Sequence, residues 1–465
     1  MPVAPEHLRP RWGDTPPTRM TLPPPRMAGW PPAGSNKCCS AKFVWMAVGV
    51  VSLHVISPLQ AHADSSPRQM AMEVAIQEAK VRQEAKQTRS RFLEASDQAA
   101  GGETPDDLKT PWTFHWSGYA KNLFTRSDTL AEEHVIADLS RLRLNTEASY
   151  REALDLYLSY DQEAILGSIL RTDQFRTFKD VDSGTWIDAD HEFLEAGRDL
   201  VWRHRLYRGY AKLRTPGAIL VIGRQRIAWG TARFWNPVDL FNPISPLAIE
   251  REEKIGVDAL DAELRLPLQS RAELVYAPQT AWNKSSLGGR LSTVLYSYEI
   301  SAVTGKFGDD NVFGATFDGH LLNGELRGEG TVTNPKGEDA YLRAVIGYEY
   351  DFANTLTVFG EYFYNGNAAP DPTGEQRLLS RTIFTTQTHF LGAGLGYDVT
   401  PLLRVETYGI LAVEDAESAF LNPLLRYNLR PNLDVLAGAQ LFLGPARSEY
   451  GLLPNVYYAQ LQWFF

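Results

Sequence analysis

The residues of this chain that could do chemistry are charged side chains at alternate positions of several short stretches. In "LSRLRLNTEASYR", residues 139–151, Arg141, Arg143 and Glu147 alternate with Leu142 and Leu144. Successive side chains of a β-strand point to opposite faces, so these charges share one face and the leucines share the other. A face with both signs of charge can line a polar conduit that selects solutes, or it can brace a wall with salt bridges.

The same alternation recurs in "ALDLYLSYD", "DAYLRAVIGYEY" and "NLDVLAGAQLFL". Arg224 and Arg226 join the charged face, although the apolar face of their strand is unclear. The pattern predicts a set of lumen residues that influence selectivity: Arg141, Arg143, Arg224, Arg226, Glu263, Arg265, Arg343, Glu349, Arg404 and Glu406.

An apolar, proline-rich segment follows Arg226 closely. It reads "ARFWNPVDLFNPISPLAIEREEK", residues 232–254. A loop of this composition would be poorly solvated, so it can fold into the mouth of a barrel as a constriction or pack against neighbouring loops at the rim. If it folds inward, it would narrow the lumen near Arg224 and Arg226 and favour anions locally. The candidate constriction residues are Trp235, Asp239 and Phe241.

Catalytic and metal-binding patterns are weak. Histidines such as His115, His204 and His389 are present, but no G-x-S-x-G motif and no serine in a recognisable nucleophile context occur. The acidic stretch "DADHEF", residues 188–193, lacks the glycine and the spacing of a calcium loop. We therefore expect no enzymatic activity, no cofactor and no metal.

The elements that must position these charges are strands of a closed barrel. Segments of about ten residues with apolar and polar faces are typical of transmembrane β-barrels. Compact breaks such as Thr215–Gly217 and Leu322–Gly324 alternate with long connections at 163–200, 231–254, 366–387 and 444–454. We predict an all-β fold, a transmembrane antiparallel up-and-down β-barrel. It has 18 strands if "SLGGRLS", residues 286–292, is a strand that turns at Ser292 and Thr293; 16 strands is the alternative.

The chain divides into three parts. Residues 1–63 predict a presequence, because the apolar run at 43–56 follows Lys37 and Lys42 and precedes a small-residue end at Ala63. An uncleaved anchor is the alternative. Residues 64–111 are rich in helix formers, so we predict a short periplasmic helical arm and linker there. We predict that residues 112–465 form the barrel. Both cysteines, Cys38 and Cys39, lie in the presequence.

The last residues, "YYAQLQWFF", alternate apolar and polar positions and end in Phe465. This strand resembles the C-terminal signal of Gram-negative outer-membrane β-barrels. Together with the step "VIGRQRIAWGTARFWNPVDLFNP" and the barrel layout, it gives residues 112–465 a resemblance to porin-like barrels, nearest to the alginate-export type. The resemblance implies an outer-membrane location, engagement of Phe465 by the barrel-assembly machinery, and anionic saccharides as solutes. The mixed signs of the expected lumen charges depart from an arginine-rich lumen.

Charge excludes some partners. The chain has 46 Lys and Arg and 56 Asp and Glu; removal of residues 1–63 takes away six and two of these and leaves a net charge of −14. Such acidity argues against a nucleic-acid partner. The sequence therefore predicts an outer-membrane, porin-like channel for small hydrophilic solutes or anionic saccharides, in contact with outer-membrane lipid. One alternative is a scaffold or receptor barrel that does not conduct, and a further alternative is a barrel hydrolase. The sequence leaves the oligomeric state open.

Overall fold

The structure is a computed structural model that divides into two compact units, residues 1–106 and 107–465. It describes residues 111–179, 186–187, 189, 191–196, 199–251, 254, 256–369, 383, 385–414 and 417–465. The predicted presequence and helical arm lie outside the described residues. The second unit is described below by itself.

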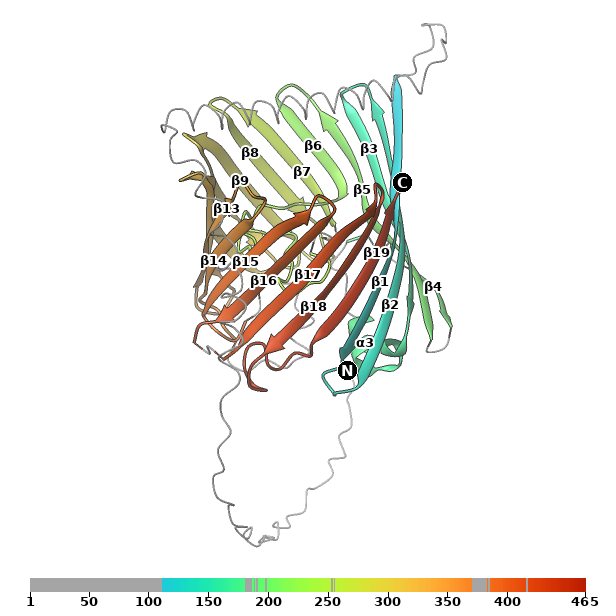
Figure 1. Ribbon diagram of the computed structural model, residues 1–465. Helices are drawn as coiled ribbons and strands as arrows, with labels where there is room; N and C mark the ends of the chain where they lie inside the picture. Colours follow the sequence, from blue (N-terminus) through green and yellow to red (C-terminus); the bar gives the residue numbers. More distant parts are fainter. Residues whose placement is uncertain are drawn as a thin grey trace, which may run out of the picture. The chain divides into compact units, whose positions relative to one another are not determined.

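The described part of this unit is built almost entirely from antiparallel strands (Figure 1). Nineteen strands are described: β1 (Trp112–Asp128), β2 (His134–Tyr150), β3 (Leu154–Leu166), β4 (His191–Ala196), β5 (Leu200–Arg214), β6 (Ala218–Gln225), β7 (Val257–Leu266), β8 (Ser270–Ala277), β9 (Ser286–Leu295), β10 (Tyr298–Phe307), β11 (Asp310–Leu321), β12 (Gly324–Asn334), β13 (Tyr341–Asp351), β14 (Thr357–Asn365), β15 (His389–Thr400), β16 (Leu403–Ala412), β17 (Ala419–Arg430), β18 (Leu433–Leu443) and β19 (Val456–Phe464).

Eighteen of these strands close into a ring. β1 pairs with β2 on one side and with β19 on the other, which leaves no open edge between the first and last strands. β3 pairs directly with β5 along its whole length. The short β4 lies against the first residues of β5 and is the strand outside the ring among those described. The prediction of a closed antiparallel barrel with 18 strands is confirmed, and the alternative of 16 is wrong.

The connections differ between the two ends of the barrel. Eight short turns, such as Tyr296–Ser297 and Leu322–Asn323, join strands at the end that we call the turn end. The strand ends that the long connections 167–199, 226–256, 366–388 and 444–455 join lie at the other end, which we call the loop end. The first carries the helices η2 (Ser168–Arg171) and α3 (Asp173–Lys179). No helix among the described residues is long and apolar enough to cross a membrane.

One predicted turn is wrong. Ser292 and Thr293 do not turn the chain, because β9 continues through them to Leu295 and the turn follows at Tyr296. Ser292 faces the interior, where it is 4% exposed and its hydroxyl lies 3.0 Å from that of Ser301 on β10. Tyr296 has a φ of 57°, in the left-handed region that a tight turn requires. Ser292 and Thr293 have the composition of a turn, but their hydroxyl groups contact Ser301 and Ser270 on the neighbouring strands.

The wall has the two faces that the alternation predicts. On β2, Leu142 and Leu144 are exposed on the outer face, whereas Arg141 and Arg143 are buried on the inner face. The same holds on β13, where Ile346 is exposed and Glu349 is buried. A shift of register by one residue would turn these charges outward, so the apolar outer face fixes which residues line the interior.

Candidate functional site

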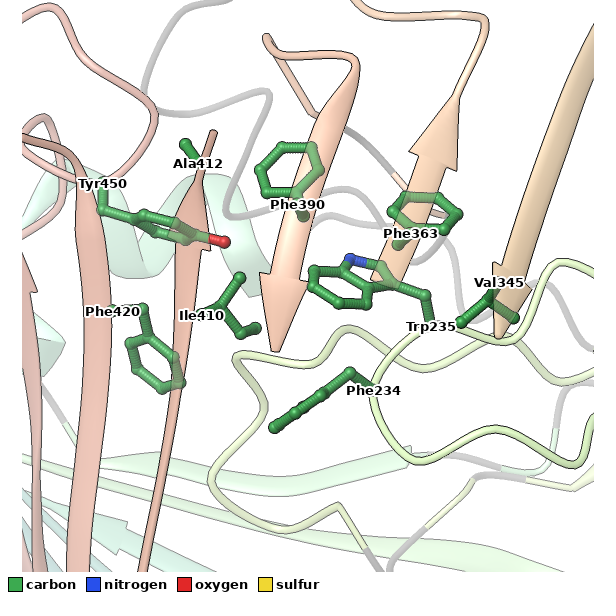
Figure 2. Packing of buried hydrophobic residues seen from close by; sticks show 9 residues of the cluster. All are labelled: Phe234, Trp235, Val345, Phe363, Phe390, Ile410, Ala412, Phe420 and Tyr450. Carbon is green, nitrogen blue, oxygen red and sulfur yellow. The ribbon is translucent and has the colours of Figure 1, made fainter. Parts of the chain in front are cut away.

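The connection between β6 and β7, which we call loop L3 (residues 226–256), folds into the barrel. Its residues Phe234 and Trp235 are 0% and 1% exposed. The ring of Trp235 stacks on Phe363 of β14 with centroids 4.9 Å apart, and Phe234 packs against Phe359 with centroids 5.3 Å apart. Figure 2 shows both side chains against the inner sides of neighbouring strands. Phe234 and Trp235 therefore pack against side chains of the wall strands, and the constriction role of Trp235 stays a prediction.

Asp239 and Phe241, the other predicted constriction residues, lie deeper in the same loop. The ring of Phe241 contacts Trp229 and Phe307 edge-on, each with centroids 5.0 Å apart. Asp239 is 2% exposed and forms an ion pair with Lys254. Burial raises the pKa of Asp239, and Lys254 opposes this shift. Asp239 thus holds two parts of L3 together, and Phe241 packs L3 against β10.

Carboxylates of the wall fasten the first part of L3. The backbone N–H groups of Arg233, Phe234 and Trp235 all donate to Glu361 of β14. The N–H of Thr231 donates to Glu329 of β12 at 3.2 Å. The indole N–H of Trp229 donates to Glu273 of β8 at 2.9 Å.

The last part of L3 is fastened to the opposite part of the ring. Glu250 forms ion pairs with Lys121 of β1 and Arg141 of β2. The side-chain amide of Gln440 on β18 donates to the carbonyl of Leu247 at 2.8 Å. L3 therefore contacts strands in different parts of the ring.

The predicted lumen residues Arg141 and Arg143 face inward but are buried in ion pairs. Nε of Arg141 lies 2.6 Å from Glu163, and Nε of Arg143 lies 2.6 Å from Asp161. The guanidinium of Arg143 also lies 3.4 Å from the ring centroid of Tyr207. Arg141 thus links β2 to β3 and to L3, and Arg143 links β2 to β3 and β5.

Arg224 and Arg226, predicted together, lie in different surroundings. Arg224 is 1% exposed, and its guanidinium donates two hydrogen bonds to Asp258 of β7. It also donates to the carbonyl of Ile187, whose own N–H donates to Asp258. The Arg224–Asp258 pair thus holds Ile187, in the connection between β3 and β5, against the wall. Arg226 follows the end of β6, is exposed, and interacts electrostatically with Asp239.

The other predicted lumen residues are spread around the ring. Glu349 binds Arg233 of L3 and Arg327 of β12. Nε of Arg343 donates to Asn365 at 2.9 Å, and Arg404 pairs with both Asp398 and Glu406 at 2.8 Å. Glu263 and Arg265 alternate on β7 with the exposed Leu264 and Leu266.

Sequence reasoning missed a column of cations on β5. Arg203, Arg205 and Arg208 are partly exposed, and Nε of Arg203 lies 2.7 Å from Glu163. The pairing of β3 with β5 shifts register between Ser159 and Tyr160. This irregularity changes the alternation after Arg205, so Arg208 reaches the ring of Tyr207 and the carbonyl of Lys254 in L3. The alternation of Arg203 and Arg205 in "LVWRHRLYRGYAKLR" could have revealed the first two.

Burial separates the charged side chains of the interior into covered and accessible ones. Behind the cationic column, Asp155, Asp161 and Glu163 are 5%, 2% and 0% exposed. The side chain of Arg203 is 32% exposed. Across the ring, the wall carboxylates that hold L3 are covered: Glu329 and Glu361 are 5% and 4% exposed. Along β3 and β5, the partly exposed charged side chains are therefore cations.

A cavity of about 440 Å³ lies between L3 and strands β9 to β11. Its charged and titratable lining residues are Arg290, Glu299, Asp318 and His320. Glu299 pairs with Arg271 and Arg290, so both signs of charge meet here. Among the described residues, no group of three or more His, Cys, Asp or Glu is arranged to hold a metal ion.

A closed antiparallel barrel of 18 strands with a loop folded inside defines the class of fold. No family model matches the chain, and no curated protein matches it. Solved structures do: OccAB2 of Acinetobacter baumannii has 11% identity and a TM-score of 0.50, with 76% of this chain and 98% of that chain covered. This similarity shows the fold.

Two further solved structures were found in the same comparison. The outer membrane protein opdK from Pseudomonas aeruginosa has 11% identity and a TM-score of 0.49, with 76% of this chain and 98% of that chain covered. Pseudomonas aeruginosa OccK2 (OpdF), solved in complex with glucuronate, has 9% identity and a TM-score of 0.47, with 76% and 96% covered.

Proposed function

We propose that this chain is an outer-membrane channel for small hydrophilic solutes, and that it favours solutes with an anionic group. The observation that carries the proposal is the partly exposed column of Arg203, Arg205 and Arg208 beside L3. A solute that passes the loop meets these cations, whereas the nearby carboxylates are buried in ion pairs or under L3. Anionic saccharides, which the alginate-export resemblance implies, belong to this solute class.

The narrowing by L3 strengthens this preference. Two unit charges 4 Å apart interact by about 1 kcal/mol in bulk water and by about 4 kcal/mol at the effective dielectric constant near a protein surface. A wide aqueous lumen would screen the arginines, so selectivity depends on the loop that brings solutes close to them. A barrel of 16 to 18 strands is wide enough to leave an aqueous channel.

The membrane setting of the proposal follows from the outer face. Exposed Leu142, Leu144 and Ile346 suit contact with outer-membrane lipid. The turn end would face the periplasm and the loop end the outside, as in other barrels with short periplasmic turns. Phe465 would serve recognition of the last strand by the barrel-assembly machinery. The proposal includes residues 1–63 as the presequence and 64–111 as the periplasmic arm, and it assigns no enzymatic activity and no cofactor.

Reconstitution of the purified barrel in planar lipid bilayers tests the proposal. We expect discrete conductance steps, a reversal potential in a KCl gradient that indicates anion preference, and inhibition of current by small sugar acids. A folded barrel that stays silent at every voltage would favour a scaffold or receptor that does not conduct.

A further inference from the structure

The described residues of L3 form no helix or strand, yet they keep one path along the inner wall. Aromatic packing of Phe234 and Trp235 gives it affinity for the wall, but such packing is weakly directional. A rigid path needs directional contacts to the backbone. Glu361 supplies them at the centre of the aromatic cluster, two residues before Phe363 on the same face of β14.

The carboxylate of Glu361 accepts three consecutive backbone N–H groups. Oε2 lies 2.7 Å from the nitrogen of Arg233, and Oε1 lies 3.0 Å and 3.1 Å from the nitrogens of Phe234 and Trp235. An ionised carboxylate is a pure acceptor, so both oxygens can serve N–H donors at once. An amide of the same shape would keep one acceptor and direct an NH₂ group at the N–H of Arg233 or at those of Phe234 and Trp235.

We propose that Glu361 is the positioning residue of the constriction: its carboxylate holds residues 233–235 of L3 in the lumen and thereby sets the width of the path. This inference rests on the proposed channel function. It assigns the pore width to a wall residue that is 4% exposed and that solutes need not touch.

Other charged groups around this contact assist the carboxylate or oppose it. Arg251 of L3 interacts favourably with Glu361, whereas Glu329 of β12 is a like charge nearby. The side chain of Arg233 forms an ion pair with Glu349 of β13, the strand next to β14. This ion pair adds to the attachment of residues 233–235 to the wall. Protonation of Glu361 would remove the charge that orders the three N–H groups, as the amide substitution does.

The test is the single-channel conductance of Glu361→Gln in planar bilayers. Loss of one hydrogen bond to a charged group shifts the equilibrium between docked and released residues 233–235 by about tenfold. We therefore expect a second, larger conductance state whose occupancy rises about tenfold or more over the wild type. Glu147→Gln is the control, an inward glutamate near the turn end of β2; it should leave the occupancy of the larger state at the wild-type level, whatever it does to the conductance itself.

A double-variant comparison separates positioning from a general structural effect. Deletion of residues 234–243 should raise conductance, and Glu361→Gln on that background should add nothing if Glu361 acts through L3. An added effect there, or a wild-type trace for the single variant, would overturn the proposal.

If Glu361→Gln does not assemble, acidification of the wild-type channel tests the proposal instead. The larger conductance state should appear as pH falls, and an unchanged trace would refute the role of Glu361. A wild-type barrel that never conducts refutes the channel function instead.

Discussion

Replacement of Arg224 by alanine should destabilise the barrel without changing its ion selectivity. Its guanidinium is buried and donates to Asp258 at 2.9 and 3.1 Å and to the carbonyl of Leu206 at 2.9 Å. The substitution would leave Asp258, itself 4% exposed, without its cation. Breaking a buried pair by removal of one partner costs about 3 to 5 kcal/mol, since an uncompensated charge stays buried.

Urea unfolding of the folded barrel in lipid vesicles, followed by tryptophan fluorescence, measures this cost. Removal of both charges, as in Arg224→Met with Asp258→Leu, should recover part of the stability, because no unpaired charge remains. The N–H of Ile187 and the carbonyls of Ile187 and Leu206 would still lose their partners, which leaves a cost of about 0.5 to 1.5 kcal/mol for each hydrogen bond. Wild-type stability of Arg224→Ala, or a clear loss of its anion preference, would refute the structural role given to this residue.

Two further predictions address the wall. Val435→Arg should lower barrel stability, because Val435 pairs with the outward Tyr427 and Leu461 and the arginine would face lipid. Such a cost is about 2 to 4 kcal/mol at the bilayer midplane and about 0 to 1 kcal/mol near an interface, and the third residue of β18 lies toward the turn end. An unchanged unfolding midpoint would contradict the outward assignment. Deletion of Phe465 should impair assembly, measured as the fraction of heat-modifiable barrel in the membrane. Its N–H and carbonyl both bond to Gly118 and its ring lies near Trp116, so normal assembly of the deletion would show that this closure is dispensable.

The wall was predictable from sequence because lipid fixes one face. Leu142 and Leu144 cannot exchange places with Arg141 and Arg143 without exposing charge to lipid, so period-two alternation determines facing. Strand ends were less certain. Ser292 and Thr293 have the composition of a turn, and what distinguishes them is an inward contact with Ser301 that becomes evident when β10 is placed beside β9.

The site was predictable in part. The apolar loop indicated a constriction because its side chains need burial, but the sequence does not show which wall residues receive them. Nothing near Glu361 in the sequence indicates that it meets residues 233–235. Arg224 and Arg226 lie two positions apart, yet Arg224 is buried in an ion pair with Asp258 and Arg226 is exposed. The partners on neighbouring strands decide whether a charged side chain is accessible. The register shift in the pairing of β3 with β5 breaks the alternation that would have identified Arg208 as inward.

The central claim is that the accessible cations of β5 beside L3 make the channel favour anions. The most direct measurement is the reversal potential of single channels in a KCl gradient, compared between the wild type and Arg203→Ala with Arg208→Ala. We expect the wild type to favour chloride and the double variant to lose most of that preference while its unfolding midpoint shows a folded barrel. An equal reversal potential in the two proteins, or a cation preference in the wild type, would contradict the account.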